Sequence, residues 1–353
     1  MNITSKAHNK SRFLLGMFLL SLYISAELSL AELSVWSAVW AQQPSPSSLS
    51  SQSAAVPNSN LSLSFDEKRA FKILSELVQR GQRYYGAPMR NEVIQGLAKQ
   101  LQDLGAEISL QAFEKVEPKS QLKYTLTNIV ARFNPQAKQR VILGSHWDTR
   151  LWAEEDHNPN LKSKPITGAN DGSSGVAVLL ELARQLDKLK LKDLGVDIVL
   201  FDGEEFGRPG SDDYCAGSRY FAQNLSTYYP SVKPKAVIVI DMVGDKDLAF
   251  PPEQSSVKFA RPLTTLIWRE AIKLKLPAFQ RGLERGSPHA KSLWIVDDHS
   301  PFQKLGIPAV LVIDLNYPHW HTHQDTMDKI SPQSLKQTGL ALLASLKTLN
   351  TIP

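Results

Sequence analysis

The sequence predicts an α/β fold: a single domain with a mostly parallel central sheet flanked by helices on both faces. Two observations lead to this prediction. From residue 141 onward, short apolar runs typical of strands alternate with longer segments whose apolar residues recur at helical spacing. These strand runs are apolar throughout rather than at every second position, so both faces of the sheet must be covered.

The elements follow in order along the chain. Two helices come first, over 64–81 and 91–105, and both have apolar residues at helical spacing. The segments 107–116 and 124–133 alternate with period two and predict an antiparallel pair of strands. The alternation that follows consists of predicted strands at 141–148, 196–202, 235–244 and 307–315 and predicted helices at 173–189, 217–225, 263–274 and 331–349.

The start of the chain has the pattern of a targeting segment. Residues 1–41 are predicted to be a signal peptide, because a basic stretch precedes the uncharged apolar run 13–26, which is short for a membrane span. Cleavage after Ala26, Ala31 or Ala41 fits the small-residue rule, and an uncleaved membrane anchor is the alternative. We therefore expect a secreted or periplasmic protein.

A linker and one folded domain account for the rest of the chain. Residues 42–60 are rich in Ser, Pro and Gln and nearly without charge, so they predict a disordered linker. Residues 61–353 remain as the catalytic domain, with no second linker and no internal repeat.

Composition excludes several classes of site and partner. The chain has one cysteine, so it can form no intrachain disulfide and no thiolate-rich zinc site. The net charge of +5 is modest, and no basic stripe with interleaved aromatics is present, so we expect no nucleic-acid partner. We also expect no stable membrane partner unless the signal segment stays uncleaved.

Polar residues gather where the predicted strands end. In a parallel sheet, ligands bind beyond the carboxyl ends of the strands, so these side chains should meet at one edge. The residues concerned are His146, Asp148, Asp171, Asp202, Glu204, Glu205, Asp241 and His321. Each alone has an ordinary explanation as a strand-end histidine, a turn aspartate or a helix cap. Together they would repel one another, so the cluster predicts a divalent cation.

Zinc suits this set of side chains, because it accepts imidazole nitrogen and carboxylate oxygen. The adjacent glutamates suit two different roles. Successive residues point in different directions, so one carboxylate can bind the metal while the other faces the substrate as a general acid/base.

The motifs around these residues resemble the zinc aminopeptidase-like superfamily, which includes co-catalytic aminopeptidases and animal-type glutaminyl-peptide cyclotransferases. The resemblance covers roughly residues 65–350. It rests on the His-x-Asp motif at His146 and Asp148 and on the segments GANDGSSGVAVLLELAR, FDGEE, IDMVG, DDHSPFQKLGIPAV and WHTHQDTMD, in that order.

The resemblance implies a zinc site. Asp171, Glu205 and His321 correspond to the ligands of the zinc ion that both branches of the superfamily retain. His146 and Asp241 correspond to the ligands of a second zinc ion in the aminopeptidases, where the counterpart of Asp171 bridges the two ions. We therefore expect one zinc ion if the protein is a cyclotransferase and two if it is an aminopeptidase.

Three features favour the cyclotransferase branch. Asp297 stands ahead of Asp298, where aminopeptidases usually have Ser and the cyclotransferases use a catalytic Asp. Trp320 directly precedes the predicted ligand His321, as in the cyclotransferases. A long polar insertion also separates the glutamate pair from the segment GSRYFA. Two other positions depart from the cyclotransferases. One aromatic residue that those enzymes carry shortly after the glutamate pair has no counterpart in FGRPG, and the position of another is occupied here by about Asn316.

The implied activity is conversion of N-terminal glutamine in peptides or proteins to pyroglutamate with release of ammonia. Glu204 would be the general acid/base, and Asp241 would link it to Asp297 in a shared-proton network. Asp297 would hydrogen-bond the substrate amide nitrogen, and Trp320 would stack over the substrate side chain. The alternative is an exported co-catalytic di-zinc aminopeptidase.

Overall fold

The computed structural model of the chain describes residues 63–209, 211–284 and 286–352. These residues belong to one compact unit that begins at Leu61. The predicted signal peptide (1–41) and linker (42–60) lie outside the described residues. Within the described ranges, no helix combines the length and the apolar character that a membrane crossing needs.

A six-stranded sheet forms the centre of the fold, in the order β1-β2-β4-β3-β5-β6. The strands are β1 (Glu107–Val116), β2 (Lys123–Phe133), β3 (Gln139–His146), β4 (Leu194–Phe201), β5 (Ala236–Asp241) and β6 (Ala309–Ile313). The last four are parallel to one another, whereas β1 and β2 form an antiparallel pair that joins the edge of β4. The predicted mostly parallel sheet and the antiparallel pairing of the first two strands are confirmed.

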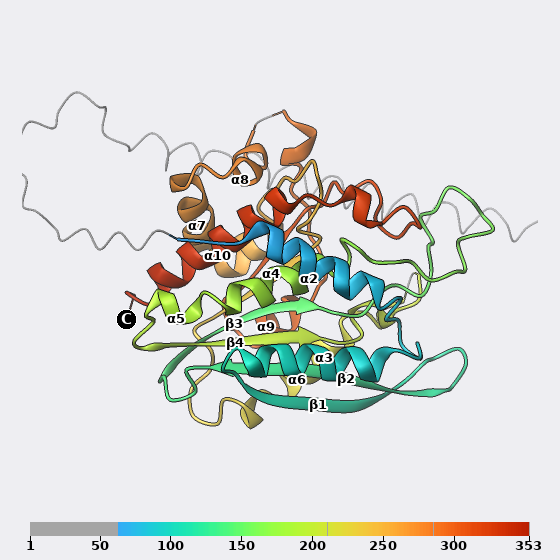
Figure 1. Cartoon of the computed structure of the whole chain (residues 1–353), viewed down its shortest axis with the longest axis horizontal. Coiled ribbons are helices and arrows are strands. Elements are labelled where there is room, and N and C mark those ends of the chain that lie inside the picture. The colour runs from blue at the N-terminus through green and yellow to red at the C-terminus, as the bar shows by residue number, and fades with distance from the viewer. Residues whose placement is uncertain (1–62, 210, 285, 353) are drawn as a thin grey trace, which may run out of the picture. The chain divides into compact units, whose positions relative to one another are not determined.

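Helices cover both faces of this sheet. The helices are α2 (Glu67–Gln79), α3 (Arg90–Asp103), α4 (Ser174–Ala183), α5 (Leu186–Leu189), α6 (Ala216–Gln223), α7 (Gln254–Lys273), α8 (Pro277–Arg281), α9 (Ser300–Lys304) and α10 (Pro332–Leu349), with 3₁₀ turns η1 (Glu204–Phe206), η2 (Leu225–Thr227), η3 (Pro288–Ala290) and η4 (Met327–Lys329). Helices α2, α4 and α10 pack against one another on one face (Figure 1).

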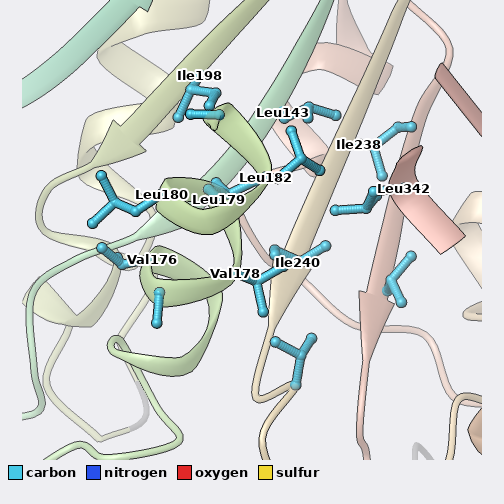
Figure 2. Close-up of a cluster of buried hydrophobic side chains, with 14 of the residues drawn as sticks. Leu143, Val176, Val178, Leu179, Leu180, Leu182, Ile198, Ile238, Ile240 and Leu342 are labelled. Atoms are coloured by element: carbon cyan, nitrogen blue, oxygen red, sulfur yellow. The ribbon is translucent and has the colours of Figure 1, made fainter. Parts of the chain in front are cut away.

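Successive strand residues enter different cores. Ile198 and Ile238 pack with the apolar sides of α2, α3, α4, α7 and α10. Their neighbours Val199 and Val237 pack on the other face with Phe221 of α6 and Phe302 of α9. Figure 2 shows side chains of α4 meeting those of β3, β4 and β5 and Leu342 of α10. The sheet is therefore buried on both sides, as the continuous apolar strands predict.

Two predicted helices differ from the observed ones. The segment 173–189 forms two helices, α4 and α5, rather than one. The predicted helix 263–274 begins earlier, at Gln254, because the Glu253 carboxylate caps it by accepting hydrogen bonds from the backbone N–H groups of Ser255 and Ser256. Pro262 has no N–H to continue the helical bonding, and the backbone kinks at Ala260 just before it.

Candidate active site

The parallel strands carry the predicted site residues at their carboxyl ends. His146 is the last residue of β3, Asp241 is the last of β5, and the glutamate pair begins η1 just after β4. Asp171 lies in the loop before α4, and His321 lies in the loop after β6. The topology thus brings five separate segments to one edge of the sheet.

Asp171, Glu205 and His321 converge on one point. Each offers an oxygen or nitrogen atom within 4.8 Å of those of the other two. Nε2 of His321 lies 3.1 Å from Oε1 of Glu205 and 3.6 Å from Oδ2 of Asp171. All three side chains are buried, and Oδ2 of Asp171 has no hydrogen-bond partner among the described residues. Two carboxylates and an imidazole directed at one buried point fit a metal ion.

The electrostatics of this group agree with its geometry. Burial, and then the charge of Glu205, raise the pKa of Asp171 to about 8. Burial alone would lower the pKa of His321, but Glu205 and Glu154 raise it to about 10. A cation would offset the repulsion between the carboxylates and replace the proton on the imidazole.

A second group shares one residue with the first. His146, Asp171 and Asp241 also offer atoms within 4.8 Å of one another. Nε2 of His146 lies 3.0 Å from Oδ1 of Asp241 and 3.2 Å from Oδ1 of Asp171. Asp171 thus directs Oδ1 to one group and Oδ2 to the other, and the donor set accommodates one ion or two.

Glu204 stands beside the ligand groups without belonging to either. Its Oε1 accepts a hydrogen bond from Sγ of Cys215, 3.3 Å away, and its backbone carbonyl accepts one from the Cys215 N–H. Burial and then the charge of Glu205 raise the pKa of Glu204 well above its ordinary value, and the charge of Asp297 adds to this. A protonatable carboxyl at this position can accept and return a proton.

Asp297 lies at the end of the loop that precedes α9. It is 4% exposed, and burial followed by the charge of Asp241 raises its pKa to about 6. Oδ1 of Asp241 lies 3.0 Å from Nε2 of His146 and accepts a hydrogen bond from the Met242 N–H. The predicted shared-proton network of Glu204, Asp241 and Asp297 stays a prediction.

Trp320 lies next to the first ligand group. Its indole is 44% exposed and stacks on the ring of His321, with ring centroids 3.9 Å apart. Trp320 is therefore accessible to another molecule beside His321. This placement accords with the predicted substrate contact, which stays a prediction, as do the roles of the other site residues.

Two aspartates that the sequence does not single out as catalytic hold the site loops in place. Asp148 accepts hydrogen bonds from the backbone N–H groups of Glu204 and Glu205, at 3.2 and 3.1 Å. Asp325 accepts those of Asn170 and Asp171, at 2.8 and 3.1 Å. The His-x-Asp motif gives a sequence signal for the role of Asp148. Asp325 is one of several polar residues in its segment, so the sequence gives no signal that sets it apart.

Backbone strain gathers at the same place. Among the described non-glycine residues, His321, Met242 and Cys215 adopt φ of 51°, 46° and 58°, a region that side chains disfavour. Gly172 has φ of 85°, and a Cβ there would lie 2.0 Å from the Asp148 carbonyl oxygen. Only glycine fits at this position, and a fold that enforces such conformations fixes the side chains of the site.

Comparison with known proteins identifies the family. Residues 128–346, more than half of the chain, match the model of Peptidase family M28. The chain belongs to this family. The resemblance predicted from the motifs is thereby confirmed, and the buried His, Asp and Glu cluster is consistent with the metal site of an M28 enzyme.

The relatives are described with more than one activity. Glutaminyl-peptide cyclotransferase of Gloydius blomhoffii is 29% identical over 288 residues, which cover 72% of this chain and 74% of that protein. The glutaminyl cyclase structure from Porphyromonas gingivalis gives a TM-score of 0.71 at 32% identity and covers 81% of this chain and 99% of that one. A Zn-dependent exopeptidase from Parabacteroides distasonis gives 0.72 at 28% identity, covering 80% and 98%. Fold similarity alone thus does not select the reaction.

Proposed function

We propose that the protein is a glutaminyl-peptide cyclotransferase that converts the N-terminal glutamine of peptides or proteins to pyroglutamate and releases ammonia. The observation that carries the proposal is Asp297, a buried carboxyl whose charge acts on Glu204 but which belongs to neither ligand group. Cyclisation releases the side-chain amide nitrogen of the substrate as ammonia, and a carboxyl outside the ligand groups can bind and orient that nitrogen. The relatives described as glutaminyl cyclases support the same choice.

In this proposal Asp171, Glu205 and His321 hold one zinc ion. Their imidazole nitrogen and carboxylate oxygens are ligands that zinc accepts. When bound, zinc supplies Lewis-acid polarisation of the γ-amide of the substrate. The substrate brings its own nucleophile, the α-amine, so cyclisation requires no activated water and no second ion.

The remaining steps belong to side chains of this protein. Glu204 takes a proton from the attacking α-amine and returns one to the leaving nitrogen, a role that its raised pKa suits. Asp297 accepts a hydrogen bond from that nitrogen and orients it. Trp320 packs on the glutamine side chain with the exposed part of its indole. Atoms balance, because the new bond from the α-amine nitrogen to the carbonyl carbon of the side-chain amide (Cδ) replaces the bond from that carbon to the nitrogen that leaves as ammonia.

A di-zinc aminopeptidase is the second candidate, and one observation favours it. The group formed by His146, Asp171 and Asp241 offers a complete second set of donors. Amide hydrolysis would use two ions to activate a water molecule, which cyclisation does not need.

One experiment separates the two reactions. Purified protein is incubated with a peptide that begins with glutamine and, separately, with an aminoacyl chromogenic amide. We expect the peptide to lose the mass of one ammonia and the amide to stay intact. Release of the chromophore without cyclisation would overturn the proposal in favour of the aminopeptidase.

A further inference from the structure

A buried arginine lies behind the first ligand group. Arg150 follows β3, and its side chain is fully buried. Its Nη1 donates to Oε2 of Glu205 at 3.0 Å and to the backbone carbonyl of Gly207 at 2.6 Å. Its Nη2 donates to the Tyr214 hydroxyl at 2.7 Å and to Oε1 of Glu154 at 2.5 Å. The guanidinium therefore fixes the position of Glu205 and of Glu154 together.

Glu154 extends this contact to the other side of the group. Its Oε1 lies 2.9 Å from Nδ1 of His321. A carboxylate can only accept a hydrogen bond, so Nδ1 of His321 carries the proton and donates it. The ring nitrogen Nε2 then faces Glu205 and Asp171. Such a contact sets both the tautomer and the orientation of a metal-binding imidazole.

Arg150 also decides which oxygen of Glu205 is available. Oε2 is engaged by the guanidinium at 3.0 Å, whereas Oε1 faces Nε2 of His321 at 3.1 Å. One oxygen of Glu205 is thus held by the protein, and the other is directed into the ligand group. The contacts join two candidate ligands that are 116 residues apart in sequence.

We propose that Arg150 and Glu154 are positioning residues that preset Glu205 and His321 for the metal ion. The contacts run from Glu205 through Arg150 and Glu154 to His321, so they hold both side chains with their free donor atoms facing each other. Neither positioning residue offers an atom to the ligand groups themselves. The inference rests on the proposed ligand set, and it holds for either of the two candidate reactions.

Glu154 is the better of the two residues to test. The Arg150 guanidinium is also packed near the rings of Trp152 and Tyr214, so its replacement endangers the fold. The Glu154 side chain is 19% exposed and lies at the edge of the network. The neighbouring Glu155 is exposed and provides a matched control, because it contacts the site through its backbone N–H, which donates to the His321 carbonyl and is kept in any variant of its side chain.

The test measures zinc affinity of the metal-free protein by competition with a chromogenic chelator. We expect Glu154→Ala to bind zinc about 10- to 100-fold more weakly than wild type, the range typical of residues that orient a metal ligand. Glu154→Gln should lose less, because its amide oxygen still accepts the Nδ1–H bond of His321. Glu155→Gln should bind as wild type, and circular dichroism should show all the metal-free variants folded.

A graded loss that the Gln variant partly restores would not arise from a purely structural role. Wild-type affinity in Glu154→Ala, or an equal loss in Glu155→Gln, would overturn the inference. A wild-type protein that binds no zinc would overturn the ligand assignment itself and this inference with it. The failure of cyclisation alone, with the affinity pattern intact, would leave the positioning role supported and count against the proposed reaction.

Discussion

Replacing Asp297 by Asn tests the proposed reaction most directly. Asp297 is 4% exposed, so a hydrogen bond that its charged form accepts from the substrate nitrogen would be poorly screened by water. Loss of one such interaction in a transition state costs about 2.7–4 kcal/mol. At about 1.4 kcal/mol for each factor of ten, the turnover rate should fall roughly a hundred- to thousandfold.

The same substitution should leave the fold intact. Oδ1 of Asp297 accepts the Asp298 backbone N–H, and the amide oxygen of Asn can accept it too. The raised pKa of Asp297 means that its charged form is disfavoured in the folded protein, so a neutral Asn should keep or raise the melting temperature. A slower enzyme of unchanged or higher stability therefore indicates a role in the reaction.

The assay is the rate of ammonia release from a glutamine-initiated peptide, with zinc content measured in the same samples. Asp193→Asn is a suitable control, because Asp193 is exposed and precedes β4 at the opposite end of the sheet. Asp297→Ser places the aminopeptidase residue at this position and should be as slow as Asp297→Asn. Wild-type turnover by Asp297→Ser would refute the reasoning, because Asp297 would then serve only the start of α9.

Three further predictions concern the metal, stability and export. Elemental analysis after extensive dialysis should find one zinc per chain, and a stable ratio of two would favour the aminopeptidase. Glu253→Gln should destabilise the protein by about 3 kcal/mol at neutral pH. Burial by itself would raise the pKa of Glu253, but His299 and the N–H groups that Glu253 caps outweigh burial and lower this pKa from 4.5 to about 2. A carboxyl whose pKa is lowered by folding stabilises the fold at any pH above its pKa in the unfolded chain. Wild type should therefore lose this contribution as pH falls from about 4.5 to about 2, which circular dichroism can follow. An acid transition that is unchanged in Glu253→Gln would contradict the role assigned to Glu253. We also propose export of the protein, so N-terminal sequencing of envelope material should begin near Gln42, and a membrane-bound chain beginning at Met1 would indicate an anchor instead.

The sequence predicts the larger part of the fold for a physical reason. Strands buried on both faces must be apolar throughout, and long amphipathic helices must repeat at 3.6 residues, so both leave patterns that can be read. Helices α8 and α9 leave no such pattern, because each has five residues. The early start of α7 depends on the Glu253 cap and on the kink at Ala260, which tertiary packing stabilises.

Some residues of the candidate site can likewise be predicted from the sequence, and others cannot. His146 and Asp241 end strands and Asp171 lies in the loop just before a helix, so the sheet topology alone places them together. Arg150 and Glu154 lie in a polar loop that resembles a solvated surface, and only the fold brings that loop beside His321. Their importance comes from contacts between distant segments, which a single sequence does not record.

The burial of Cys215 makes the protein suited to thiol-labelling experiments. Cys215 is the only cysteine of the chain, it is 1% exposed, and its Sγ lies against Glu204. A thiol reagent can reach it only when the segment around η1 and the start of α6 moves apart. The labelling rate, read without interference from any other cysteine, therefore measures how often the acid/base region opens, and a ligand bound in the site should slow it.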